Sequence, residues 1–152
     1  MNLIQRFASY AAAFEKAVAG NDWAAVEPCF SEDAVYETFG PAPFAGRHAP
    51  RSAVLAGLRA SLDGFDRRFE SRELELLEGP RESGSEVWVR WRATYRVAGA
   101  PPLAIEGEET AVFRGERICR LEDRFEPASA ERTTRFLREH ADKLRPAPAR
   151  AD

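Results

Sequence analysis

The second half of the chain holds four consecutive strand-like segments, and the short turns between them constrain the fold more than any other feature. The segments span about residues 68–78, 86–97, 103–114 and 117–125. The turns between them contain Gly79-Pro80, Pro101-Pro102 and Gly115-Glu116. Because connections this short join antiparallel neighbours, the sequence predicts a four-stranded antiparallel meander.

Helical patterns flank the meander on both sides. Apolar residues recur at three- and four-residue steps over residues 2–19, with Asn2 as the expected N-cap and Gly20-Asn21 as the end. Shorter helices are predicted over residues 22–30 and 49–62, with a strand over 34–39 between them, and a last helix over 127–144. This order predicts an α+β fold, in which a strongly curved antiparallel sheet surrounds a pocket and the N-terminal helices close its mouth.

The length of 152 residues fits one domain. We expect it to span residues 1–145 and to include the last helix, followed by a disordered Arg/Pro/Ala tail over 146–152. Between the first strand and the third helix, Gly40-Pro41-Ala42-Pro43 is expected to interrupt regular structure, because proline lacks the backbone donor.

Charge and composition exclude several kinds of partner. The net charge is −3, with acids and bases interleaved, so we expect no nucleic-acid binding. No stretch approaches the roughly 20 apolar residues of a membrane span, so we expect no membrane partner. Cys29 and Cys119 have neither metal nor redox spacing, and with no export signal they are interpreted as reduced thiols of a cytoplasmic protein. No cofactor motif and no metal site is found, and we expect no cofactor.

Strand alternation singles out three carboxylates. Side chains alternate between the two faces of a strand, and on three strands one acid falls on the more apolar face. Glu109 falls with Ile105 and Phe113, Asp123 with Leu121 and Phe125, and Glu37 with Val35 and Phe39. Burial beside like charges raises a carboxyl pKa, which suits a general base or proton shuttle. The alternative is that each acid pairs with an arginine or reaches water.

The strand over residues 86–97 raises a different question. Its apolar face contains Trp91, and its other face contains Arg90, Arg92 and Arg96. One interpretation places these arginines on an outer face, paired with glutamates of neighbouring strands or across a homodimer interface, and we expect a homodimer there. The other interpretation places one or two of them in the pocket, where they would bind an anionic substrate.

Several short motifs resemble the SnoaL-like, or nuclear transport factor two-like, superfamily over about residues 7–126. They are Gly20-Asn21-Asp22-Trp23, Phe30-Ser31-Glu32-Asp33-Ala34-Val35-Tyr36, Phe44-Ala45-Gly46-Arg47, Val112-Phe113-Arg114-Gly115-Glu116-Arg117-Ile118 and Leu121-Glu122-Asp123-Arg124-Phe125. The resemblance implies a cone-shaped, cystatin-like roll. It leaves function open, because the same fold hosts enzymes and non-catalytic binders.

Three branches of that superfamily imply different site residues. Resemblance to ketosteroid isomerases implies Glu37 as the base and Glu109 as the protonated hydrogen-bond donor, with Phe14 where those enzymes have a tyrosine. Resemblance to polyketide cyclases implies Asp123 as the acid/base group. Limonene-epoxide hydrolases also have an aspartate there, but their second acid is missing from Arg90-Trp91-Arg92.

These observations lead to one hypothesis and one alternative. The hypothesis is a cofactor-independent acid/base enzyme of the isomerase, cyclase or dehydratase type that acts on a small apolar carbonyl compound. Its catalytic residues would be Glu37, Glu109 and Asp123, and its pocket walls Tyr10, Phe14, Phe39, Trp91, Phe113 and Phe125. The alternative is a non-catalytic ligand-binding or dimeric accessory domain.

Overall fold

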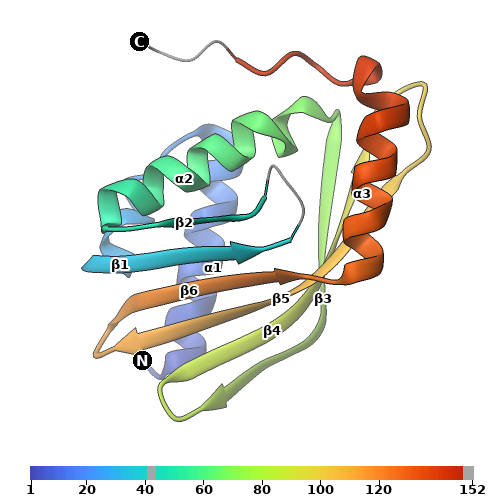
Figure 1. Cartoon of the computed structure of the whole chain (residues 1–152). Helices are drawn as coiled ribbons and strands as arrows, with labels where there is room; N and C mark the ends of the chain where they lie inside the picture. Colours follow the sequence, from blue (N-terminus) through green and yellow to red (C-terminus); the bar gives the residue numbers. More distant parts are fainter. Residues whose placement is uncertain (41–43, 149–152) are drawn as a thin grey trace.

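A computed structural model describes residues 1–40 and 44–148, and the described chain has the predicted α+β architecture (Figure 1). Pro41-Ala42-Pro43 and residues 149–152 of the expected tail lie outside the described residues. The helices are α1 Leu3–Gly20, α2 Arg51–Gly64 and α3 Pro127–His140. The strands are β1 Phe30–Phe39, β2 Gly46–His48, β3 Ser71–Ser83, β4 Glu86–Arg96, β5 Leu103–Arg114 and β6 Arg117–Phe125.

The described strands form one sheet in the order β2-β1-β6-β5-β4-β3. Strands β3 to β6 are paired antiparallel in sequence order, so the predicted meander is confirmed. The sheet as a whole is mixed, because β1 pairs parallel with β6. The chain between these two strands runs through most of the domain, and a connection of that length permits parallel pairing.

The first helix follows the predicted pattern closely. Asn2 caps α1 through a capping box with Gln5, in which each side chain accepts a hydrogen bond from the other residue's backbone N–H. The helix ends at Asn21, which has a left-handed backbone with φ of 57°. Its apolar stripe buries Phe7 and Tyr10 in the core. This stripe therefore fixes which side of α1 faces the sheet.

Some boundaries differ from the predictions. The helix predicted over residues 22–30 is reduced to a 3-10 turn at Glu27–Cys29, since Pro28 cannot donate a helical hydrogen bond, and β1 begins already at Phe30. Strand β3 continues beyond the predicted turn at Gly79-Pro80, with an irregular register there. The last helix gives way to a 3-10 turn at Ala141–Lys143, and β2 was not predicted.

Two clusters of buried side chains lie on the inner face of the curved sheet. The first joins α1 and α2 to β1, β4, β5 and β6 and includes Phe30, Val54 and Leu121. The second joins the far ends of β4 and β5 to α3 through Phe69 and Phe136. In Figure 1, α1 crosses behind the strands and α3 stands at the far end of the sheet. Among the described residues, no helix is both long and apolar enough to cross a bilayer.

Candidate functional site

A cavity of about 380 Å³ lies between the inner face of the sheet and the helices α1 and α2. Its wall is mostly apolar, and four of the predicted wall residues line it, namely Tyr10, Phe14, Trp91 and Phe125. Phe113 also points inward, but it is buried in the first core cluster and does not line the cavity. The cavity is large enough for a small organic molecule.

The predicted orientation of β1 is wrong, and two predicted site residues therefore lie outside the cavity. From residue 34 on, the buried residues of this strand are Ala34, Tyr36 and Thr38, which places Glu37 and Phe39 on the opposite face. Glu37 accepts a hydrogen bond of 2.7 Å from Arg120. The Phe39 ring lies 4.0 Å from the Arg124 guanidinium. Glu37 is thus paired with Arg120, which it shares with Glu122, and neither Glu37 nor Phe39 is part of the candidate site.

Glu109 and Asp123 form a pair of carboxyl groups in the cavity wall. They are direct cross-strand partners on β5 and β6, and both line the cavity, as their strand alternation predicts. The Tyr36 hydroxyl donates a hydrogen bond of 3.0 Å to Asp123 Oδ2. Asp123 Oδ1 is buried with no hydrogen-bond donor of ordinary geometry among the described residues. One buried oxygen of the pair therefore remains available to a ligand or a proton.

The two carboxyl groups differ in how strongly they hold a proton. Burial, followed by the negative charge of Asp123, raises the pKa of Glu109 well above its usual value. Burial also raises the pKa of Asp123, but the hydrogen bond that the Tyr36 hydroxyl donates opposes this increase. Two such acids share one proton over a wide pH range. The larger increase, at Glu109, favours Glu109 as the protonated member and Asp123 as the carboxylate.

Tyr10 adds a phenol to this end of the cavity. It comes from α1, is only 4% exposed, and lines the cavity. Burial, and then the charges of Glu109 and Asp123, raise the pKa of its hydroxyl well above the usual value. The hydroxyl therefore stays protonated and can donate a hydrogen bond to an oxygen bound near the carboxyl pair.

A second polar group, which we call the Arg72 cluster, consists of Glu15, Asp66, Arg72 and Tyr95. Arg72 Nη1 lies 2.9 Å from Glu15 Oε2, and Arg72 Nε lies 3.1 Å from Asp66 Oδ2. The Tyr95 hydroxyl donates a hydrogen bond of 2.9 Å to Asp66. All four residues line the cavity. Sequence reasoning missed this cluster, although Arg72 lies at an alternating position inside a predicted strand.

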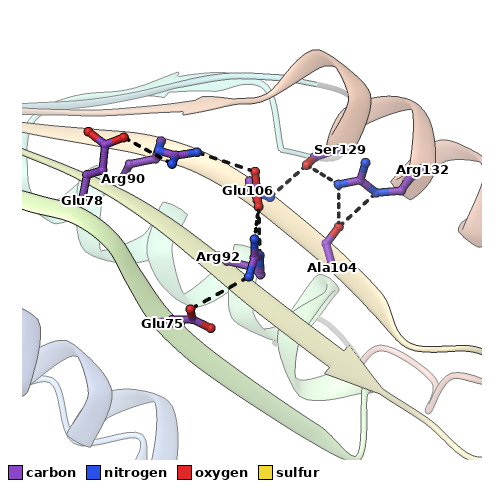
Figure 2. A network of polar contacts seen from close by, with 8 residues as sticks. All are labelled: Glu75, Glu78, Arg90, Arg92, Ala104, Glu106, Ser129 and Arg132. Atoms are coloured by element: carbon purple, nitrogen blue, oxygen red, sulfur yellow. Dashed lines mark hydrogen bonds and ion pairs between the residues drawn. The ribbon is translucent and has the colours of Figure 1, made fainter.

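The arginines of β4 lie on the outer face of the sheet and pair there with glutamates of neighbouring strands, as the first of the two interpretations predicts. Figure 2 shows Glu106 between Arg90 and Arg92, while Glu78 and Glu75 contact the same arginines from β3. Arg92 Nη2 lies 2.7 Å from Glu106 Oε1. The interpretation that placed these arginines in the pocket is wrong, because they alternate with the inward Trp91 and do not line the cavity.

The cavity therefore combines an apolar interior with one reactive end. Asp123 can accept a proton there, while Glu109 and Tyr10 can donate hydrogen bonds to an oxygen that gains negative charge. Within residues 1–40 and 44–148, no three His, Cys, Asp or Glu side chains are placed to hold a metal ion. What the residues of this end offer is proton transfer between carboxyl groups and a bound molecule.

Comparison with protein families identifies a match over most of the chain. The profile described as the SnoaL-like domain matches residues 10–123. No curated protein matches the sequence.

Solved structures show the same fold at low sequence identity. Bal32a, from a soil-derived mobile gene cassette, is 19% identical, with a TM-score of 0.65 over 85% of this chain and 95% of that one. A candidate isomerase from Rhodopseudomonas palustris is 17% identical, with a TM-score of 0.64 over 85% and 96%. TerC, co-crystallized with polyporic acid, is 13% identical, with a TM-score of 0.61 over 88% and 95%. At these identities the likeness concerns the fold alone.

Proposed function

The chain belongs to the SnoaL-like domain family, and on that premise we propose that it is a cofactor-independent acid/base enzyme that acts on a small, mostly apolar carbonyl compound. The observation that carries the proposal is the Glu109–Asp123 pair in the wall of an apolar cavity. A carboxylate next to a protonated carboxyl supplies both partners that a proton transfer needs. The candidate isomerase among the structural neighbours, and TerC co-crystallized with polyporic acid, are consistent with such a site.

In the proposed reaction, Asp123 is the base. Its carboxylate removes a proton from the carbon next to the substrate carbonyl, and the electron pair of that C–H bond moves onto the carbonyl oxygen to form an enolate. Glu109 and Tyr10 donate hydrogen bonds to this oxygen. Asp123 then returns the proton, either to the same carbon or to another position of the conjugated system, which gives isomerisation.

Tyr36 supports this division of roles. Its hydrogen bond to Asp123 Oδ2 favours the ionised form of Asp123, because a donated hydrogen bond stabilises a carboxylate. Glu109 receives no comparable donor among the described residues, and it therefore retains the proton. Glu37, which lies beside Tyr36 on β1 but points to the other face, has no part in this mechanism.

The proposal is tested by hydrogen–deuterium exchange, which does not require the natural substrate. The protein is incubated in D₂O with a panel of small ketones such as 2-acetylnaphthalene and 1-tetralone, and deuterium at the α-carbon is measured by NMR. We expect exchange above the buffer rate for at least one ketone. The Asp123→Asn variant should lose at least about 100-fold of that rate, the usual contribution of a general base.

The matched control is Glu122→Gln, which removes the neighbouring acid on the same strand. Glu122 faces the opposite side and pairs with Arg120 at 2.7 Å, so this variant should exchange at the wild-type rate. Exchange that persists in Asp123→Asn removes Asp123 from the mechanism. Ketone binding with no exchange by the wild-type protein favours the alternative of a non-catalytic ligand-binding domain.

The homodimer and the cytoplasmic location are kept as part of the proposal. The outer face alternates arginine and glutamate, so two copies can place opposite charges against each other across a twofold axis. Both cysteines are free thiols, as in a reducing compartment. Sedimentation at micromolar concentration tests the dimer, and a monomer there contradicts it.

A further inference from the structure

Arg72 lies at the mouth of the cavity that holds the carboxyl pair. Leu74 and Leu76, which share the face of Arg72 on the edge strand β3, line the cavity and are 46% and 51% exposed. The Arg72 side chain also lines the cavity, but it is only 15% exposed. Its guanidinium is therefore a mostly buried group at the entrance of the site.

The carboxyl pair and the Arg72 cluster are close enough to influence each other. Burial, then the charge of Asp123 and, to a smaller extent, the charge of Glu15 raise the pKa of Glu109. The influence of one charge on another falls with distance. A small molecule whose carbonyl lies against the carboxyl pair can therefore extend to the Arg72 cluster.

Glu15 holds one side of the Arg72 guanidinium. Arg72 Nη1 donates hydrogen bonds of 2.9 Å and 3.2 Å to the two carboxylate oxygens of Glu15. Burial lowers the pKa of Arg72, but the hydrogen bond with Glu15 and the negative charges nearby raise it to well above its usual value. The guanidinium is therefore always charged, and its position is fixed.

The other edge of the guanidinium, formed by Nε and Nη2, has donors without acceptors. Nε is buried and makes no hydrogen bond among the described residues. Asp66 Oδ2 lies 3.1 Å from Nε but off the direction of its N–H bond, and it already accepts a hydrogen bond of 2.9 Å from Tyr95. Within residues 1–40 and 44–148, Nη2 donates no hydrogen bond. A ligand atom that accepts from this edge would remove the cost of a buried, unsatisfied donor.

The charges around Arg72 indicate what kind of acceptor fits. Two carboxylates, from Glu15 and Asp66, already lie beside the one guanidinium. An anionic ligand would be a third negative group there, and an ammonium group would meet N–H donors with its own donors. A neutral oxygen accepts hydrogen bonds from the guanidinium without adding charge.

The remaining wall of the cavity favours an apolar body for the ligand. Phe44, Leu62, Trp91 and Ala93 are among its residues, and none of them carries a charge. The matching molecule is therefore apolar in its middle, with one oxygen at the carboxyl pair and another at the mouth.

We propose that Arg72 is a specificity-determining residue, whose free N–H groups bind a neutral carbonyl oxygen of the ligand at the end remote from the carboxyl pair. The ligand is then an apolar ketone with a second, uncharged carbonyl group at its far end. The inference rests on the proposed function for the position of the first carbonyl. Binding of the second oxygen depends on Arg72 alone.

The test compares two ketones of the same shape. 2,6-Diacetylnaphthalene and 2-acetyl-6-isopropenylnaphthalene differ only in a C=O group that replaces C=CH₂, and both are titrated into the wild-type protein at pH 7 by calorimetry. We expect the diketone to bind about tenfold more tightly, through one hydrogen bond from a charged donor and the twofold statistical advantage of a symmetric ligand. 6-Acetyl-2-naphthoate, which carries a carboxylate, should bind more weakly than the diketone.

Two variants assign the preference to Arg72. Arg72→Met removes the donors, so the preference should fall to the statistical value of about twofold, while the affinity for the isopropenyl ketone stays within about threefold. Arg72→Met/Asp66→Asn also removes the buried carboxylate that loses its cation, and it should show the same loss if the single variant does not fold. Arg96→Met is the matched control. It removes the same charge from the outer face, where Arg96 pairs with Glu73 at 3.1 Å, and it should retain the tenfold preference.

The outcomes separate this inference from the proposed function. The role of Arg72 is overturned if the wild-type protein binds neither ketone or prefers the diketone by no more than twofold. It is also overturned if the naphthoate binds most tightly, or if the preference survives in the folded Arg72 variants. If the preference behaves as expected but no ketone exchanges deuterium, the role of Arg72 stands and the acid/base function fails. Exchange without any preference gives the reverse result.

Discussion

Glu106 and Glu109 are three residues apart on β5, yet their side chains lie on opposite faces of the sheet and their pKa values shift in opposite directions. Glu106 lies on the outer face, where its hydrogen bond with Arg92 and then that with Glu126 lower its pKa. Glu109 lies on the inner face, where burial and the charge of Asp123 raise its pKa well above the usual value. The same side chain is thus held as an ion on one face and as an acid on the other.

The difference comes from the surroundings on each face and not from the residue type. On the outer face, arginines of β4 lie beside glutamates of neighbouring strands, so that Glu75, Glu78 and Glu106 each have a nearby cation (Figure 2). On the inner face near Glu109, the closest ionisable partner is another carboxyl group. The sheet therefore separates charges that stabilise the fold from charges that are available for chemistry.

The contrast between the inner and outer faces of the sheet is tested most strongly by adding one acid to each face. Ala111→Asp places a carboxylate without a cation in the first core cluster, where Ala111 has no exposed surface. We expect the free energy of unfolding to fall by about 3–5 kcal/mol, as for other unpaired buried charges. Urea denaturation measures it. Val112→Asp, on the outer face of the same strand and opposite Arg120, should change the stability by less than about 1 kcal/mol. Equal losses in both variants would contradict the separation of the two faces.

The pH dependence of deuterium exchange reports the shared proton directly. Activity requires the singly protonated pair, so the rate should rise as the pair loses its first proton and fall as it loses its second. Both limbs should lie above pH 4, because the pKa values of Asp123 and Glu109 are raised from 3.8 and 4.5. Each limb should change the rate about tenfold per pH unit.

The assignment of the acid limb can be checked by removing one hydroxyl. Tyr36→Phe deletes a hydrogen bond that stabilises ionised Asp123, so the acid limb should move to higher pH while the fold is retained. A profile that is flat from pH 4 to 9, or an acid limb that moves to lower pH in this variant, contradicts the assignment of the proton to Glu109.

Glu109→Gln should affect activity and stability in opposite directions. Glutamine still donates a hydrogen bond but is a weaker donor than a carboxylic acid, and we expect exchange to fall about tenfold. The folded state holds the Glu109 proton more strongly than the unfolded state, so the contribution of Glu109 to the stability of the wild-type protein declines as pH rises above about 4.5.

The variant lacks this decline. In urea denaturation it should be more stable than the wild-type protein at pH 8, with a difference that disappears below pH 4.5. Glu108→Gln, the neighbouring exposed residue on the outer face, serves as the control and should show no such pH-dependent gain. A Glu109→Gln variant that is less stable than wild type at pH 8 would mean that the buried acid is compensated after all.

The smallest effect is expected for Glu37→Gln. Glu37 pairs with Arg120 in a partly exposed ion pair, and Arg120 keeps Glu122 as a second partner. We expect a change in stability below about 1 kcal/mol and exchange within twofold of the wild-type rate. Loss of exchange in this variant, with the fold intact by circular dichroism, would return Glu37 to the mechanism.

The sequence predicted the inner faces of β4, β5 and β6 well, because each has one clearly apolar alternating set. On β5, Ile105, Ala111 and Phe113 surround Glu109, so its position could only be inward. Strand β1 gave no such contrast. Both of its alternating sets contain an aromatic residue, Tyr36 on one and Phe39 on the other, and the choice between them depended on Arg124, which covers Phe39 from a strand 85 residues later.

The Arg72 cluster was missed for a related reason. A sequence pattern assigns charged residues of an edge strand to solvent, and Arg72 shares its face with Leu74 and Leu76 on a strand rich in glutamate. Only the fold brings Glu15 from α1 and Asp66 from the turn after α2 to the same guanidinium. The prediction of a helix after residue 22 was wrong because of one local residue, Pro28. The prediction of the strand meander was confirmed, because its turns are encoded by neighbouring residues.

The parallel pairing of β1 with β6 also determines when the carboxyl pair can be assembled during folding. Phe30 lies beside Ile118 in this pairing, so the two strands meet across a loop of nearly 90 residues. Closing a loop of that length costs entropy before its contacts repay it, and contacts this distant in sequence slow folding. On a growing polypeptide, the strands β3 to β5 can pair first, whereas Tyr36 finds Asp123 only after the ribosome has released β6. The reactive end of the cavity is therefore among the last parts of the molecule to form.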